Sequence, residues 1–216
     1  PTLRKLVTAA RFNPSLPYLS FLCINFDAPV VQEAASWFLD AVFLNYNSSY
    51  LERMLEQMLD EGDSREVTRF LRAVDVRIDG FRVERAPEWR GQRVFVRHKV
   101  RGKAYELRLS EESAGTQKLM GLAAYLMTAL ERGGTVVVDE LDAKLHPKLL
   151  RYVILLFKDP EVNKSGAQLI FSSQDVSTMR NDVFRRDEIW FAARGEGEAS
   201  QLWSLADIHE ANGNLV

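Results

Sequence analysis

Apolar side chains recur at helical spacing through the first third of the chain. Segment 27–46 has an aspartate and a proline near its start and then apolar positions on one face, which predicts a helix. Segment 48–62 repeats the pattern with leucines and methionines, and segment 64–74 predicts a third, shorter helix. The pattern then changes to that of extended chain, which predicts an antiparallel meander with strands at 75–84, 92–100 and 103–109.

The spacing of apolar residues along the chain changes at residue 113. Leucines and alanines at helical spacing continue to Gly133-Gly134, where the helix is expected to end. Short apolar runs then alternate with helical patterns: strands are predicted at 135–139 and 167–171, helices at 147–157 and after Asp175, and further strands at 188–193 and 200–205. Apolar strands that alternate with helices are typical of a parallel sheet covered on both faces. We therefore predict an α/β fold, with a helical and β-meander region over 1–109 and an α/β core over 110–216.

The composition is that of a folded protein in water, because 46% of the 216 residues are hydrophobic and 27% are charged. No run approaches the roughly 18 apolar residues of a membrane span, so we expect no membrane partner. The single Cys23 excludes an internal disulfide, which agrees with a cytoplasmic location.

The net charge of −2 conceals a basic sector. Residues 65–108 carry 13 Lys and Arg against 6 Asp and Glu, a net charge of +7. Such a sector could contact nucleic acid or an acidic partner, or it could be a solvated face of the meander.

Two adjacent carboxylates, Asp139 and Glu140, follow the apolar run "GTVVV". Burying carboxylates is costly unless a cation or hydrogen bonds compensate, so this strand end needs a partner. In open α/β sheets, ligands bind beyond the carboxyl ends of the strands. One carboxylate can hold Mg²⁺ while its neighbour orients or deprotonates an attacking water, although a strand that simply ends in charge at the surface gives the same pattern.

Two more segments carry candidate chemistry. In "SEESAGTQK" (110–118), Ser113 can cap a helix, and small Ala114 and Gly115 leave the first-turn N–H groups open to an anion such as phosphate. In "AQLIFSSQD" (167–175), a buried strand ends in Ser172, Ser173 and Gln174, which can hydrogen-bond phosphate or water. Taken alone, the first segment could be a plain helix N-cap, and the second could be a strand that ends in polar residues at the surface.

Taken together, the order and spacing of these motifs resemble the C-terminal half of an ABC-type ATPase. "SAGTQ" is similar to the signature motif, "TVVVDE" to Walker B, "DAKLH" to the D-loop and "IFSSQD" to the switch segment. The stretches "ESAGTQKL", "VVVDELDAKLHP", "GAQLIFSSQD" and "DEIWFAARGEGEASQLWSL" more closely resemble a prokaryotic family of ABC-like AAA ATP-binding proteins akin to OLD, RecF and SMC heads. Many members of that family serve in phage defence.

The resemblance implies Mg²⁺-dependent ATP hydrolysis in a head-to-tail homodimer. Asp139 would help to hold Mg²⁺ and Glu140 would be the general base, while His146 and Gln174 would sense or position the γ-phosphate. The residues that would meet the γ-phosphate bound by the partner subunit are Ser113, Ala114, Gly115 and Thr116. Gln174 departs from the family's usual switch histidine, and glutamine cannot carry a positive charge, which weakens the case for efficient turnover.

A phosphate-binding loop of the form G-x-x-x-x-G-K-[ST] is absent from the sequence. In the resembled family this Walker A motif precedes the helical region, so we expect that another, N-terminal half of the same protein supplies it. The resemblance also suggests that the ATPase acts with a toxin or nuclease partner, or with nucleic acid. The main alternative is a regulatory or scaffolding module with a degenerate ATP site, favoured by Gln174. A carboxylate-metal nuclease is a third, weaker alternative, because no further acidic cluster accompanies Asp139 and Glu140.

Overall fold

The computed structural model describes residues 17–45, 55, 59, 64–73, 77–85, 92–195 and 199–208. Its centre is a parallel sheet of three strands in the order β1-β5-β6: β1 (Val42–Leu44), β5 (Thr135–Val138) and β6 (Gln168–Phe171). Val137 pairs with Phe43 on one side and with Ile170 on the other. The predicted parallel pairing of the two apolar strands that precede the candidate site is therefore confirmed.

Two helices cover one face of this sheet. These are α6 (Ala114–Arg132) and α7 (Pro147–Lys158), which precede and follow β5 in the chain. Both parallel connections step in the same direction, from β1 to β5 to β6, so right-handed crossovers bring both helices to the same face. The main core lies between them and the sheet, and its fully buried side chains include Leu119, Leu122, Leu126, Val136, Val138, Leu150 and Val153.

The opposite face of the parallel sheet is open. Phe43 and Ile170, which flank Val137 on this face, are 58% and 50% exposed. The prediction of a sheet covered on both faces is therefore wrong for the part of the chain that the structure describes. The reason is that side chains alternate between the faces of a strand, and only the Val136 and Val138 face meets helices.

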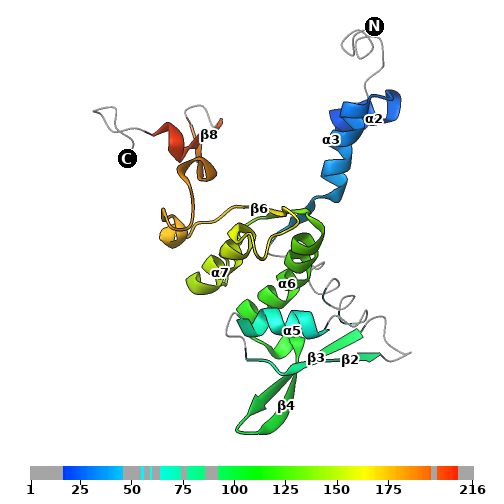
Figure 1. Cartoon of the computed structure of the whole chain (residues 1–216), viewed down its shortest axis with the longest axis vertical. Coiled ribbons are helices and arrows are strands. Elements are labelled where there is room, and N and C mark those ends of the chain that lie inside the picture. Colours follow the sequence, from blue (N-terminus) through cyan, green and yellow to red (C-terminus); the bar gives the residue numbers. More distant parts are fainter. Residues whose placement is uncertain are drawn as a thin grey trace.

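A second sheet is the predicted antiparallel meander. Its strands are β2 (Gly80–Arg85), β3 (Gln92–Val100) and β4 (Lys103–Arg108), with β3 in the middle. Helix α5 (Ser64–Ala73) packs between this meander and α6, so that Val67 and Leu71 join the same core as Val96. Figure 1 shows the meander and α5 at the end of the molecule opposite to α2 (Tyr18–Asn25) and α3 (Pro29–Asp40).

The predicted helix 27–46 is too long. Helix α3 ends at Asp40, and the next residues form β1, whose Leu44 carbonyl accepts a hydrogen bond from the Asp139 N–H at 2.8 Å. A β-branched and aromatic run, Val42-Phe43-Leu44, suits a strand once a neighbouring strand is available. In the predicted helix 48–62, Leu55 and Leu59 are helical and buried, and the rest of the segment lies outside the described residues.

The last two strands also differ from the prediction. They are β7 (Trp190–Arg194) and β8 (Ser200–Ser204), which pair antiparallel as a separate hairpin and do not extend the parallel sheet. Short 3₁₀ helices occupy Leu109–Glu111, Val176–Thr178, Arg186–Glu188 and Leu205–Asp207. Among the residues that the structure describes, no helix is both long and apolar enough to span a bilayer.

Candidate functional site

Asp139 and Glu140 lie directly beyond the carboxyl end of β5, and Ser172 lies beyond the end of β6. The Ser172 hydroxyl accepts a hydrogen bond from the Glu140 N–H at 2.8 Å and donates one to Asp139 Oδ1 at 2.5 Å. The Leu141 N–H donates to the Ser172 carbonyl at 3.0 Å, so the hydrogen bonding of the two strands continues past their ends. One serine thus orients the carboxylate of Asp139 and the backbone of Glu140 together.

A buried lysine fixes the strand-end loop, which we define as residues 139–146. Lys118, only 5% exposed, extends from α6 and donates to the Glu140 carbonyl at 2.7 Å and to the Ala143 carbonyl at 2.9 Å. Burial lowers the pKa of Lys118, while the negative charges of Asp142 and Glu140 oppose that shift. Glu140 itself has φ +51°, a left-handed conformation that is uncommon for a residue with a side chain. Lys118 therefore anchors the strand-end loop at the residue with the unusual backbone.

The first turn of α6 contacts the same loop. Ser113 is its N-cap, and the Ser113 hydroxyl accepts from the Thr116 N–H at 3.2 Å and lies 2.8 Å from the Thr116 hydroxyl. A Cβ on Gly115 would lie 2.5 Å from the Lys144 carbonyl oxygen, so only glycine allows this close approach. Ser113 and Ala114 remain exposed. Gly115 therefore allows α6 to pack against the strand-end loop, while Ser113 and Ala114 leave the start of the helix accessible.

His146 and Gln174 lie at the border of the strand-end loop. The His146 Nδ1 accepts a hydrogen bond from the Lys148 N–H at 3.2 Å, which makes His146 the N-cap of α7. The Gln174 N–H donates to Asp142 Oδ2 at 3.2 Å, and its side chain is exposed. The other carboxylate oxygen of Asp142 is buried without a hydrogen-bond partner among the described residues. Asp142 thus joins the segment after β6 to the strand-end loop.

The donor set fits a partial magnesium site. Asp139 and Glu140 are exposed, and within the described chain neither Asp139 Oδ2 nor the Glu140 carboxylate makes a hydrogen bond. No group of three His, Cys, Asp or Glu side chains able to hold a metal occurs among the described residues. Mg²⁺ prefers six oxygen ligands and commonly takes one or two from carboxylates, with the others from phosphates and water. A single carboxylate such as Asp139 suits that arrangement, whereas these side chains alone do not build a complete metal cage.

The structure thus connects the predicted site residues through three contacts. Ser172 links Asp139 to Glu140, Lys118 links α6 to the strand-end loop, and Asp142 links this loop to Gln174. Sequence reasoning assigned no role to Lys118. A signal was present, because Lys118, Leu122 and Leu126 follow each other at intervals of four along α6, which places the lysine on the buried face.

The chain was compared with families of known proteins. The family model described as "AAA domain, putative AbiEii toxin, Type IV TA system" matches residues 13–180, which include both strands and all the predicted site residues. A search among curated proteins found no match. The mixed α/β architecture with its parallel sheet fits the P-loop NTPase-like fold of an AAA domain, which is a nucleotide-binding domain of the ATPase type. The chain therefore belongs to the AAA domain family whose description names the AbiEii toxin of type IV toxin–antitoxin systems.

Proposed function

We propose that this chain provides the Walker B, signature and switch segments of an ABC-type, OLD/RecF/SMC-like ATPase that hydrolyses ATP with Mg²⁺. The observation that carries the proposal is the pair of exposed carboxylates at the end of a parallel strand, held in a fixed geometry by Ser172 and Lys118. In α/β proteins this edge of the sheet is where nucleotides bind.

Asp139 and Glu140 have different tasks in the proposed reaction. Asp139 would contribute one oxygen ligand to Mg²⁺ through Oδ2, because its Oδ1 already accepts from Ser172. When bound, Mg²⁺ neutralises charge that develops on the phosphates. Glu140, whose carboxylate makes no hydrogen bond within the described residues, would accept the proton of the attacking water. Lys118 holds the Glu140 backbone so that this carboxylate keeps its position.

The start of α6 would meet a second nucleotide. A helix terminus leaves its first N–H groups without helical partners, and the Ser113 cap satisfies only that of Thr116. The first-turn N–H groups of Ala114 and Gly115 suit the γ-phosphate of an ATP bound by a partner subunit in a head-to-tail dimer. His146 and Gln174 would complete the sensing of that phosphate from the strand-end loop and the segment after β6.

The Walker A loop would come from a segment outside these 216 residues. The sequence contains no such loop, and one face of the parallel sheet exposes Phe43 and Ile170. Parallel sheets are normally covered on both faces, so this apolar face calls for a covering segment. We assign that cover to the half of the protein that carries the phosphate-binding loop.

The process that ATP would drive is phage defence, with a toxin or nuclease partner. The sequence resemblance and the toxin named in the family description support this assignment. A non-hydrolysing scaffolding module is the second candidate, and Gln174 favours it because an amide cannot supply the positive charge of a switch histidine.

A glutamate-to-glutamine exchange tests the proposal in the full-length protein. Glu140→Gln should lower ATP turnover at least a hundredfold and preserve the ATP-bound dimer, because glutamine keeps the shape but cannot accept a proton. Phosphate release and particle mass with and without ATP are the measurements.

Glu161→Gln is the matched control, because Glu161 is exposed in the loop before the amino end of β6, whereas the site residues lie beyond the carboxyl ends of the strands, and it should leave turnover unchanged. Gln174→His should raise turnover if the amide is a handicap. Binding of ATP without any Glu140-dependent hydrolysis, before and after Gln174→His, would instead establish the scaffolding function.

A further inference from the structure

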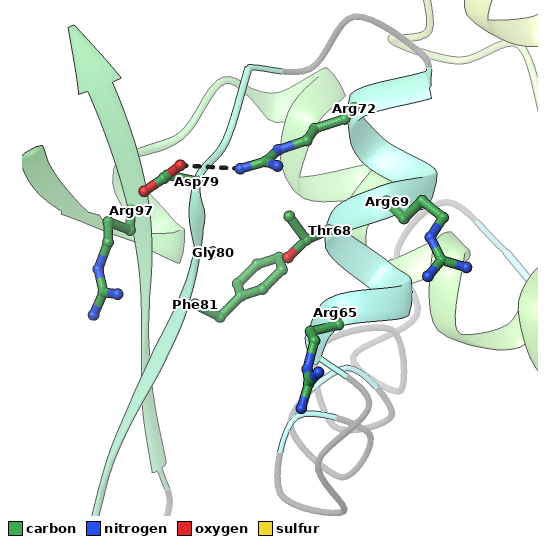
Figure 2. A pocket seen from close by; sticks show the side chains of 8 residues that line it. All are labelled: Arg65, Thr68, Arg69, Arg72, Asp79, Gly80, Phe81 and Arg97. Atoms are coloured by element: carbon green, nitrogen blue, oxygen red, sulfur yellow. Dashed lines mark hydrogen bonds and ion pairs between the residues drawn. The ribbon is translucent and has the colours of Figure 1, made fainter. Parts of the chain in front are cut away.

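A basic cavity lies outside the site described above. It occupies about 460 Å³ between α5 and the edge strand β2, and Arg97 of β3 borders it (Figure 2). Its lining residues are Arg65, Thr68, Arg69, Arg72, Asp79, Gly80, Phe81 and Arg97. None of these residues belongs to the start of α6, the strand-end loop or the segment after β6. The cavity is therefore a separate feature of the fold.

The amphipathic pattern of α5 explains why arginines line this cavity. Arg65, Arg69 and Arg72 follow each other at intervals of four and three residues, so they lie on one side of the helix. Val67 and Leu71, on the opposite side, are fully buried in the core. Burial of the apolar side thus fixes the rotation of α5, and Figure 2 shows Arg72 extending from the helix to Asp79 beside β2, with Arg65 and Arg69 further along the same helix.

Positive groups outnumber negative groups in the cavity lining. It contains four guanidinium groups and one carboxylate, Asp79, and the Arg97 guanidinium also contacts Glu106 outside the lining. Arg72 is held in place, because its Nη2 contacts Asp79 Oδ1 at 3.0 Å and its Nε donates to the Ile78 carbonyl at 2.7 Å. Arg65 and Arg69 are exposed. Arg72 is thus positioned by Asp79 and Ile78, and Arg65 and Arg69 on the same helix are accessible to solvent.

The basic surface continues over the outer face of the meander. Arg97 pairs across the strands with Glu106 and contacts its carboxylate at 3.3 Å. Arg82 shares that carboxylate at 2.9 Å, and its guanidinium lies 4.0 Å from the centre of the Phe95 ring. Arg82 also lies 3.8 Å from Glu84, so ion pairs with two glutamates hold both arginines in a fixed geometry next to the cavity.

We propose that this cavity binds the phosphodiester backbone of nucleic acid without reading its sequence. Guanidinium groups bind phosphate oxygens in pairs of parallel hydrogen bonds, which is the chemistry that the arginines around this cavity offer. The three arginines of α5 span roughly 10 Å at about 1.5 Å per residue. This length corresponds to about three steps between successive phosphates of one strand, which follow each other at about 3.4 Å along a duplex axis.

A long polyanion fits the site better than a small phosphate does. Arg65 and Arg69 are exposed, so the cavity does not enclose a small ligand, whereas a backbone could pass from α5 along the outer face of the meander. Phe81 packs partly into the core, so it offers no platform on which a base could stack. The contacts are therefore to phosphates, which explains the expected lack of sequence preference.

The experiment uses the chain and a fluorescent 20-base-pair duplex, with anisotropy measured between 50 and 200 mM salt. Removing two phosphate contacts with Arg65→Ala/Arg69→Ala should weaken binding at 50 mM salt about tenfold or more and reduce the salt slope by about two. Arg132→Ala/Lys164→Ala is the matched control, because it removes the same charge from exposed positions outside the cavity. The control should bind within threefold of the wild type.

Three results would overturn the proposal. The first is no binding of the duplex at 50 mM salt. The second is an equal loss in the cavity and control variants, which would reduce the effect to net charge. The third is displacement of the duplex by inorganic tripolyphosphate at equal phosphate concentration, which would make this a site for small polyphosphates. Thermal unfolding of both double variants should match the wild type, because all four side chains are exposed.

Discussion

Lys118 fixes the backbone of the strand-end loop in the candidate site. Its ammonium group is buried and contacts two backbone carbonyls of the strand-end loop, one of which belongs to Glu140. Lys118→Met preserves the length of the side chain but leaves these carbonyls without their donor. We expect the free energy of unfolding to fall by about 1–3 kcal/mol. Chemical denaturation measures this, and Lys148→Met, at an exposed position of α7, is the control.

The effect of Lys118→Met on the free energy of unfolding should depend on pH. Burial lowers the pKa of Lys118 below its usual value, so between the two values the unfolded chain binds more protons than the folded chain does. The stability that Lys118 contributes therefore rises as the pH increases toward 10.5. The difference in unfolding free energy between wild type and Lys118→Met should grow with pH in this range. A difference that shrinks with pH would contradict the buried contact.

At the scale of elements, the sequence predicts the helices and strands that local apolar periodicity determines, and it misses a strand that depends on a partner distant in the chain. Helices α6 and α7 and strands β5 and β6 were predicted within one or two residues, because their apolar periodicity is local. Strand β1 was predicted as helix, because its apolar residues continue the pattern of α3 and its partner Val136 lies 94 positions after Val42. The apolar run that ends in polar Asn45 was the one local signal for a strand.

The candidate site follows the same rule. The two strand ends and the cap at Ser113 were readable from motifs, since each motif occupies a few consecutive residues. The contacts that hold them together, such as Lys118 with Glu140 and Ser172 with Asp139, join residues 22 and 33 positions apart. No local pattern encodes such a pairing.

The open face of the parallel sheet leads to a prediction about β1 and β6. An exposed apolar sheet face favours association, so the isolated chain should self-associate. Phe43→Lys/Ile170→Lys should leave the stability of the chain within about 0.5 kcal/mol, because both side chains are already exposed, and should abolish the association. Light scattering and denaturant unfolding are the measurements.

Two controls define the result. Val162→Lys changes an exposed apolar residue in a loop and should leave self-association unchanged, whereas Val136→Lys on the covered face should unfold the chain. Loss of stability in Phe43→Lys/Ile170→Lys comparable to that in Val136→Lys would mean that the face is not open.

At the scale of the whole molecule, the chain belongs to the AAA domain family and carries candidate residues for Mg²⁺ and water at the end of β5. It contains no phosphate-binding loop, and the affinity of P-loop proteins for ATP rests largely on the backbone N–H groups and the lysine of that loop. The ATP hydrolysis that we propose therefore depends on joining this chain to a segment that supplies the phosphate-binding loop.

ATP hydrolysis by the 216-residue chain, alone and joined to the segment that carries the phosphate-binding loop, tests this claim most directly. Phosphate release would be measured with Mg²⁺ for the wild type and for Glu140→Gln. We predict no release above background from the chain alone, and release that requires Glu140 once the loop is present. Robust, Glu140-dependent release by the chain alone would contradict the account, because it would require a phosphate site within these residues.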